Sequence, residues 1–132
     1  MKTLILTGGS DGLGAAFGQT CLEKGYSIIC LSRRVPGYGA QHIPVDLADP
    51  ESIKAAAEQI RQKHPAFDAM VNCAGVFSQQ GQGRISWEEI QRVLTVNTMA
   101  PLFLVSGLMD LIRKNGADIL NVGSTVGYQG LC

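Results

Sequence analysis

Two serines follow apolar segments and carry hydroxyl groups that could do chemistry. Ser10 lies in Gly8-Gly9-Ser10-Asp11-Gly12, which matches the GxSxG pattern of a nucleophile elbow. Ser124 follows the run DILNVG. A serine becomes a nucleophile only when a neighbouring base takes its proton, and the elbow also needs an acid and then a histidine further along the chain. His42 and His64 are the only histidines, so attack by Ser10 stays an alternative.

The glycine-rich segment around Ser10 suggests a different chemistry. TGGSDGLG fits the pattern TGxxxGxG with Gly8, Gly12 and Gly14. Glycines at a sharp strand-to-helix turn let the backbone approach a pyrophosphate, and the N-terminus of the following helix favours its negative charge. The spacing GxGxxG does not fit, because Phe17 would replace its third glycine, and no GK[ST] follows to make a phosphate-binding loop of the nucleoside triphosphatase type.

Short apolar segments alternate with helical patterns along the chain. We expect strands at residues 3–7, 27–32, 42–45, 67–72 and 118–122. One helix should run from Gly12 to Lys24, a second should begin at Pro50 after an Asp49 cap, and a third should begin after Ser86. This alternation predicts βαβ units and a parallel sheet of the α/β class. Pro44 places the third strand at an edge.

The composition indicates a single globular domain over residues 1–132. Basic and acidic residues balance at eleven each, which gives no electrostatic footprint for nucleic acid. No apolar run reaches the length of a membrane span or of a signal-peptide core. The four cysteines form no CxxC pair and fit no zinc spacing. We therefore expect no metal, no membrane and no nucleic-acid partner, and reduced thiols in a cytoplasmic protein.

Five short motifs occur in one order along the chain: TGGSDGLG, VDL at residues 45–47, NCAG at 72–75, VN at 96–97 and NVGS at 121–124. Together they resemble the short-chain dehydrogenase/reductase family, whose members transfer hydride between a nicotinamide cofactor and a carbonyl or alcohol. The resemblance covers the whole chain. It implies a Rossmann-type doubly wound sheet with strand order 3-2-1-4-5 and a small-molecule carbonyl or alcohol substrate.

The resemblance also assigns a role to each motif. Residues implied to bind the cofactor are those of the glycine loop, the pair that flanks the adenine and the segment beside the ribose: Gly8, Ser10, Gly12, Leu13, Gly14, Asp46, Leu47, Asn72, Ala74 and Gly75. Asn97 matches the asparagine of the family's catalytic tetrad, and Ser124 matches its serine.

The residues after the second strand favour NADP(H) over NAD(H). NAD-binding sites usually place an acid there for the ribose 2′-hydroxyl, but residues 28–41 contain none. They contain Ser32, Arg33 and Arg34 instead, and arginine suits a 2′-phosphate through charge-assisted hydrogen bonds. Asp11 departs from this pattern, because family members that use NADP often carry a basic residue just before the second motif glycine.

Pro101 lies four residues after Asn97 and gives that asparagine a second argument. A proline cannot donate to the carbonyl of Asn97, so we expect a kinked helix with this carbonyl freed. The family uses it to hold a water in a proton relay. The alternative is a kink that serves packing alone.

The tyrosine and lysine of the family's YxxxK pair are missing from these 132 residues. Tyr26, Tyr38 and Tyr128 are each followed, four residues on, by a residue other than lysine. Without that pair no positioned acid protonates the developing alkoxide. We therefore expect a truncated Rossmann domain, incomplete on its C-terminal side and inactive alone. The alternatives are a non-catalytic NADP(H)-binding or scaffold protein, and an α/β-hydrolase-like protein that uses Ser10.

The segment 99–112 reads MAPLFLVSGLMDLI and is apolar on nearly every face. A helix with this pattern is buried on both sides. One side can cover the sheet. The other side needs a partner, which a homo-oligomer through helix 99–112 or further sequence would supply.

Overall fold

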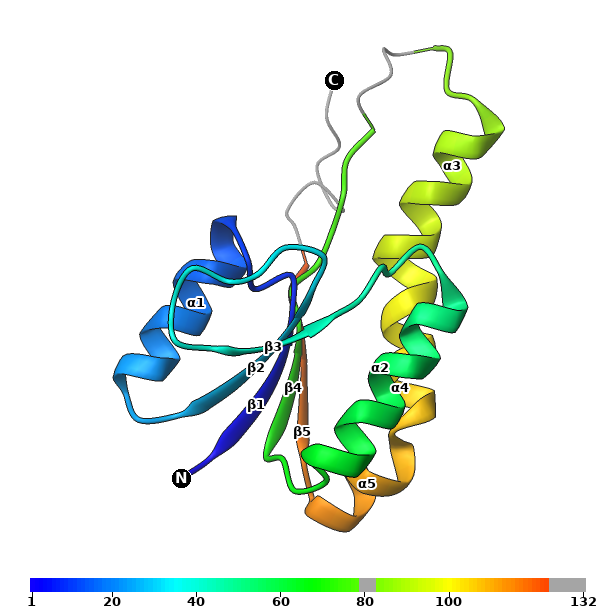
Figure 1. Cartoon of the computed structure of the whole chain (residues 1–132). Helices are drawn as coiled ribbons and strands as arrows, with labels where there is room; N and C mark the ends of the chain where they lie inside the picture. The colour runs from blue at the N-terminus through cyan, green and yellow to red at the C-terminus, as the bar shows by residue number, and fades with distance from the viewer. Residues whose placement is uncertain (79–82, 124–132) are drawn as a thin grey trace.

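Five parallel strands form one sheet in the order β3-β2-β1-β4-β5 (Figure 1). The computed structural model describes residues 1–78 and 83–123. The strands are β1 (Thr3–Thr7), β2 (Ser27–Ser32), β3 (Gln41–Pro44), β4 (Ala69–Asn72) and β5 (Asp118–Asn121). Thr7 pairs with Leu31 on one side and with Asn72 on the other, so the strands end at nearly the same level. The predicted fold class and strand order are confirmed.

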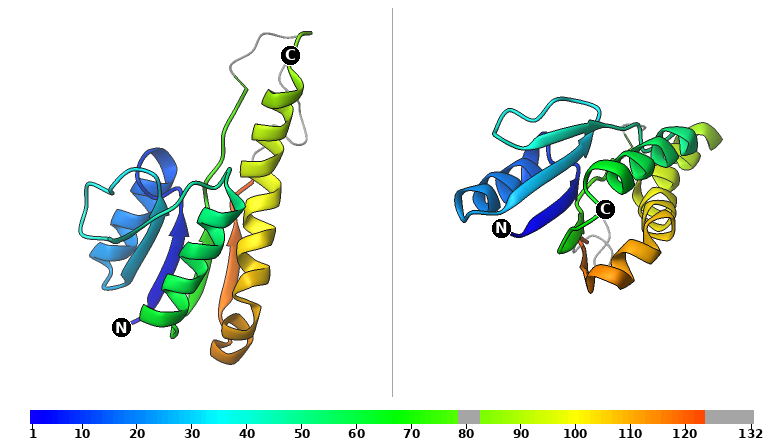
Figure 2. Two further views of the ribbon diagram at one scale, coloured as in Figure 1. Left: turned by 45° about the vertical axis from the view of Figure 1, so that its right-hand side comes forward. Right: turned by 60° about the horizontal axis from the view of Figure 1, so that its bottom comes forward.

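Helices cover both faces of the sheet, as the turned views in Figure 2 show. Helix α1 (Gly12–Glu23) lies on one face, and α2 (Pro50–Lys63) and α4 (Ala100–Gly107) lie side by side on the other. Helix α5 (Met109–Asn115) follows α4 on the second face. Helix α3 (Trp87–Leu94), which precedes α4 in the chain, extends beyond the carboxyl ends of the strands and buries none of its residues (Figure 1). The caps follow the sequence: Asp49 accepts from the Glu51 N–H at 3.0 Å, and Ser86 accepts from the Glu89 N–H at 3.2 Å.

Alternate residues of the strands fill two apolar layers, because successive side chains point to opposite faces of a sheet. Ile5, Ile29 and Met70 pack toward α2, α4 and α5. Leu4, Leu6, Ile28 and Val71 pack toward α1. The central strands are therefore apolar on both faces, as a covered parallel sheet requires.

The segment predicted as one continuous helix is broken. A π-helical turn, η1 (Thr95–Met99), precedes α4, and α4 and α5 are separated at Leu108. The chain bends by 63° at this break. Just before Pro101 the helix widens, because the Ala100 N–H donates to the Thr95 carbonyl in π-helical bonding. A π-helical turn is a local interruption of the α-helix, and here it lies directly before the proline that lacks an N–H.

Three predicted strands differ from the structure by their boundaries. The third strand begins and ends one residue earlier than expected, the fourth begins at Ala69 rather than at Phe67, and the fifth ends at Asn121 rather than at residue 122. Phe67 is nevertheless buried, and the Asp68 carboxylate accepts from the Thr3 N–H at 2.8 Å, which ties the start of β1 to the segment before β4. As predicted from Pro44, β3 is an edge strand. At the other edge, all four residues of β5 are exposed.

Within the two described ranges, no single helix is both long and apolar enough to span a membrane. The bent pair Trp87–Gly107 and Met109–Asn115 meets those criteria only when both parts are taken together, by length and composition alone.

A bidentate ion pair fixes the break between α4 and α5. Arg61 of α2 donates to both carboxylate oxygens of Asp110, at 2.7 and 3.0 Å, and to the carbonyl of Gly107 at 3.0 Å. The arginine therefore satisfies a carbonyl at the end of α4 and holds the start of α5 on α2. Hydrogen bonding from Arg61 lowers the pKa of Asp110 to about 2.

We predict that Asp110→Asn makes the stability less dependent on acid pH. The native pKa of Asp110, about 2, lies below the ordinary aspartate value of about 3.9. The stabilisation is therefore complete above the ordinary value and is lost as the pH falls through the native value. Urea midpoints should be lower for Asp110→Asn at pH 7, and the difference should shrink toward pH 2. Asp118→Asn, at an exposed position of β5 outside the described ion pairs, is the control.

Candidate functional site

The predicted cofactor residues gather at the carboxyl ends of the strands. The glycine loop follows β1, the arginines follow β2, Asp46 and Leu47 follow β3, and the NCAG segment follows β4. In an open parallel sheet this edge holds ligands, at the point where the strand order reverses. Here the order reverses between β1 and β4. The two segments at that point are the glycine loop and NCAG.

The glycine loop contains two left-handed glycines and one tightly packed glycine. Gly8 and Gly12 have φ of +70° and +54°, a region that favours glycine. A Cβ on Gly8 would lie 2.6 Å from the Ala74 Cα, and one on Gly14 would collide with the Gly8 carbonyl oxygen. Gly12 has no other atom within 4 Å of its Cβ position. The loop is thus packed on its inner side and open at Gly12.

The N-terminus of α1 differs from those of α2 and α3. Asp11 occupies its cap position but makes no side-chain cap hydrogen bond, and the first turn contains no acid. In α2 and α3 a side chain caps the helix. The first backbone N–H groups of α1 therefore stay available, and the helix dipole makes this end favourable for an anion.

Thr7 holds the NCAG segment against the glycine loop. Its Oγ1 accepts from the N–H groups of Cys73 and Ala74, at 3.2 and 3.3 Å. Asn72 donates through Nδ2 to Asn121 Oδ1 at 2.9 Å, while its own Oδ1 is buried without a hydrogen-bond partner among the described residues. Leu47 joins Thr7, Asn72 and Ala74 around a small hollow at this place.

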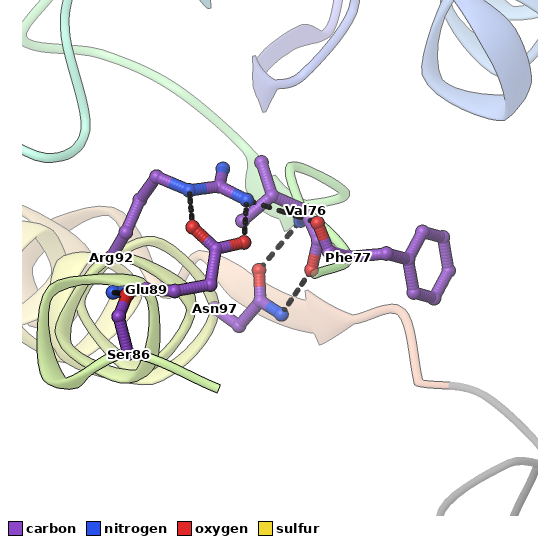
Figure 3. A network of polar contacts seen from close by, with 6 residues as sticks. All are labelled: Val76, Phe77, Ser86, Glu89, Arg92 and Asn97. Carbon is purple, nitrogen blue, oxygen red and sulfur yellow. Dashed lines mark hydrogen bonds and ion pairs between the residues drawn. The ribbon is translucent and has the colours of Figure 1, made fainter. Parts of the chain in front are cut away.

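Asn97 binds the loop after β4 through its side chain. Oδ1 accepts from the Val76 N–H at 2.7 Å, and Nδ2 donates to the Val76 carbonyl at 2.8 Å (Figure 3). Arg92 donates to the Phe77 carbonyl at 2.9 Å and is itself held by Glu89 at 2.7 Å. The two residues after Gly75 are thus fixed by α3 and η1. Asn97 is brought to the predicted cofactor segment, although no sequence feature indicated this contact.

Arg33 and Arg34 lie at the same edge and are exposed. Neither makes an ion pair with another residue of the described ranges. Ser32 is buried, and its hydroxyl donates to the Arg34 carbonyl at 2.6 Å, which turns the backbone at the end of β2. The guanidinium groups are therefore free to meet a ligand.

Ser124, the predicted catalytic serine, lies outside the described residues, as does Tyr128. Ser10 is half-buried in the turn before α1. His42 lies on edge strand β3 with Nε2 2.9 Å from the Ser32 carbonyl oxygen, and His64 caps the C-terminus of α2. Within the described ranges neither histidine hydrogen-bonds Ser10.

Three further residues shape the site without having been predicted. Thr7 joins the two central loops, Arg92 holds Phe77, and Tyr38 donates to the Gly9 carbonyl at 2.7 Å. Thr7 is the first residue of the TGxxxGxG pattern, so the motif could have indicated it. Arg92 and Tyr38 carried no such signal, because their partners are 15 and 29 residues away along the chain.

Comparison with known proteins decides the family. The family model for short chain dehydrogenase matches residues 2–132. The chain belongs to the short-chain dehydrogenase family. Galactitol 2-dehydrogenase of Agrobacterium fabrum is 25% identical to it, over 98% of this chain and 55% of that protein.

Solved dehydrogenase structures share the fold. Ligand-free aldohexose dehydrogenase of Thermoplasma acidophilum superimposes with a TM-score of 0.84 at 28% identity, over 94% of this chain and 49% of that one. A Brucella ovis oxidoreductase of the short chain dehydrogenase/reductase family, in complex with a partially ordered NAD, gives 0.81 at 31% identity, over 96% and 64%. The chain spans about half the length of the curated relatives that it matches.

The glycine loop of this family member leaves space and hydrogen-bond donors at one place. Gly12 is open to close approach, and the N-terminus of α1 carries uncapped donors beside it. A pyrophosphate placed there would meet backbone N–H groups rather than side chains. Among the described residues, no group of three or more His, Cys, Asp or Glu gathers that could hold a metal.

We predict that Asn97→Ala exposes the Val76 amide to exchange. The variant removes the acceptor of that N–H, and a hydrogen bond contributes a net ~1 kcal/mol, so exchange should be about fivefold faster or more. Amide hydrogen exchange at Val76 measures this. Asn115→Ala removes an amide that donates to Pro65, far from Val76 in the fold, and should leave Val76 unchanged. Unaltered Val76 exchange in Asn97→Ala would show that the contact does not hold the loop.

Proposed function

We propose that this chain binds NADP(H) and that the protein is an oxidoreductase, transferring hydride between the nicotinamide and a small carbonyl or alcohol. The observation that carries the proposal is the meeting of an open glycine turn, an uncapped helix N-terminus and two unpaired arginines at one sheet edge. Gly8, Ser10, Gly12, Leu13 and Gly14 would hold the pyrophosphate. Exposed Leu13 and half-buried Ser10 both lie on the loop that a ligand would reach.

The preference for NADP(H) rests on Arg33 and Arg34. They follow the end of β2. In dinucleotide-binding sheets, the loop after this strand contacts the adenine ribose. Unpaired guanidinium groups can form two hydrogen bonds each to a phosphate. No carboxylate occurs between residues 28 and 41 to repel that phosphate or to favour a free 2′-hydroxyl. Asp46 and Leu47 would flank the adenine from β3.

The remaining predicted residues would serve the nicotinamide end. Asn72, Ala74 and Gly75 lie where the ribose would pass, and Asn97 holds the following residue in place. Ser124 would hydrogen-bond the substrate carbonyl. The cofactor, when bound, supplies the hydride. Because no YxxxK pair occurs in this sequence, we propose that the 132-residue chain binds the cofactor without turnover.

An assay separates a cofactor-binding chain without turnover from a complete enzyme. The chain, saturated with NADPH, is mixed with aldehydes and ketones, and loss of nicotinamide absorbance is followed. We expect no turnover. Oxidation of NADPH would contradict the proposed need for the tyrosine and lysine of the YxxxK pair. Failure to bind any nucleotide would contradict the proposed cofactor site.

We predict that the double variant Arg33→Ala/Arg34→Ala loses the preference for NADPH. Charged hydrogen bonds contribute about 1.5–3 kcal/mol, so NADPH affinity should fall about ten- to a hundredfold, while NADH affinity should change little. Titration calorimetry with both nucleotides measures this.

Arg113→Ala is the matched control, because Arg113 lies in the last turn of α5, which leads into the start of β5 at the other end of the sheet. Equal wild-type affinities for NADH and NADPH would contradict the arginine argument. So would a double variant that keeps its preference.

We also propose that the chain self-associates through helix 99–112. The structure buries Ala100, Leu104 and Leu108 on the sheet side, as predicted, but leaves Met99 60% and Leu102 68% exposed. Trp87 and Leu94 of α3 are exposed as well. Large apolar side chains exposed along one helical segment mark an interaction surface.

We predict that Leu102→Glu shifts the chain to monomer, because a buried unpaired carboxylate opposes association. Sedimentation velocity over a range of protein concentrations measures this. Val35→Glu introduces the same charge at an equally exposed apolar residue of the β2–β3 loop and should not alter the association. A monomeric wild type would refute the proposal.

A further inference from the structure

The loop between β2 and β3 inserts one aromatic side chain beside the glycine loop. Residues 33–40 pass α1 before β3 begins (Figure 1). Within this loop Tyr38 is partly buried, and its ring packs on the apolar layer under α1 with Phe17, Cys21 and Leu22. Its hydroxyl donates to the Gly9 carbonyl at 2.7 Å. A residue four positions after Arg34 thus reaches the backbone of the pyrophosphate loop.

Two glycines make room for this contact. A Cβ on Gly18 of α1 would collide with the Tyr38 hydroxyl and lie 2.8 Å from its Cζ. A Cβ on Gly9 would lie 3.0 Å from the same hydroxyl and 2.9 Å from the Cys30 Sγ. Neither glycine has a positive φ, so backbone conformation does not require them. Space for Tyr38 and its neighbours does.

The environment keeps the hydroxyl a donor. Burial, with smaller effects from Cys30 and Cys21, raises the pKa of Tyr38 to about 12. The phenol therefore stays protonated at pH values well below 12, where it can donate to the Gly9 carbonyl.

The bond at Gly9 fixes the direction of the next donor. The carbonyl of Gly9 and the N–H of Ser10 belong to one planar peptide unit, and in a trans peptide they point in opposite directions. No described peptide is cis. A Gly9 carbonyl directed at Tyr38, in the layer under α1, therefore directs the Ser10 N–H to the other side of the loop. The Ser10 N–H is one of the donors of the glycine loop, which would hold the pyrophosphate.

We propose that Tyr38 is a positioning residue for the cofactor, which orients the Ser10 peptide of the glycine loop by holding the Gly9 carbonyl. This rests on the proposed NADP(H)-binding function. Tyr38 links the two loops that would bind the pyrophosphate and the 2′-phosphate, because it lies on the arginine loop and bonds to the glycine loop. Its effect acts on the pyrophosphate, which NADPH and NADH share.

The test is Tyr38→Phe, which removes the hydroxyl and keeps the ring. One hydrogen bond corresponds to a change of about three- to tenfold. We expect the dissociation constants of NADPH and NADH, measured by titration calorimetry, to rise together by that factor, so that their ratio is kept. The matched control is Tyr26→Phe, since Tyr26 packs on the same layer but precedes β2 at the opposite end of that strand.

The outcomes separate this proposal from the proposed function. If the wild type binds both nucleotides and Tyr38→Phe binds them equally well, the proposal is wrong and the cofactor site stands. If only NADPH weakens, Tyr38 acts through the arginines, and the proposal is also wrong. A lower melting temperature with unchanged affinities, as in any structural variant, overturns it too. A wild type that binds neither nucleotide overturns both proposals.

Discussion

The backbone contact between Gly8 and Ala74 sets the geometry of the whole edge. The turn after β1 approaches the segment after β4 so closely that a side chain at Gly8 would collide with Ala74. Thr7 reinforces this contact with two hydrogen bonds to the same segment. Since β1 and β4 lie where the strand order reverses, this contact decides how far apart the two central loops stand. The other loops are arranged around that fixed pair.

Each outer loop reaches the central pair through one side chain. Asn97 and Arg92 approach from η1 and α3 and hold Val76 and Phe77. Tyr38 approaches from the β2–β3 loop on the other side of the sheet and holds Gly9. These side chains all bond backbone groups, so they fix the course of the chain around the central pair. The uncapped N–H groups at α1 and the two unpaired arginines remain accessible at the same edge.

The sheet could be predicted because its causes are local. Apolar runs, glycines at element ends and helix-capping residues lie within a few residues of the elements that they determine. These signals predicted the five strands and the caps at Asp49 and Ser86. The strand order came from the family resemblance. The bend at Leu108 could not be predicted in this way. It depends on Arg61, which reaches Gly107 and Asp110 from a helix 46 and 49 residues earlier. The π-turn before Pro101 could not be predicted either. A helix can respond to the missing N–H of a proline with a kink or with a widened turn, and the sequence alone does not indicate which one forms.

The glycines show most clearly where sequence reasoning stops. Gly12 and Gly14 belong to one motif, yet Gly12 faces open space with a positive φ while Gly14 packs against the Gly8 carbonyl. Gly9 is a variable position of that motif and Gly18 lies beyond it, and both leave room for Tyr38 and its neighbours. A glycine in a sequence therefore indicates only that the position has no side chain. Only the fold tells whether the reason is a left-handed turn, an approaching ligand or an aromatic ring from another loop.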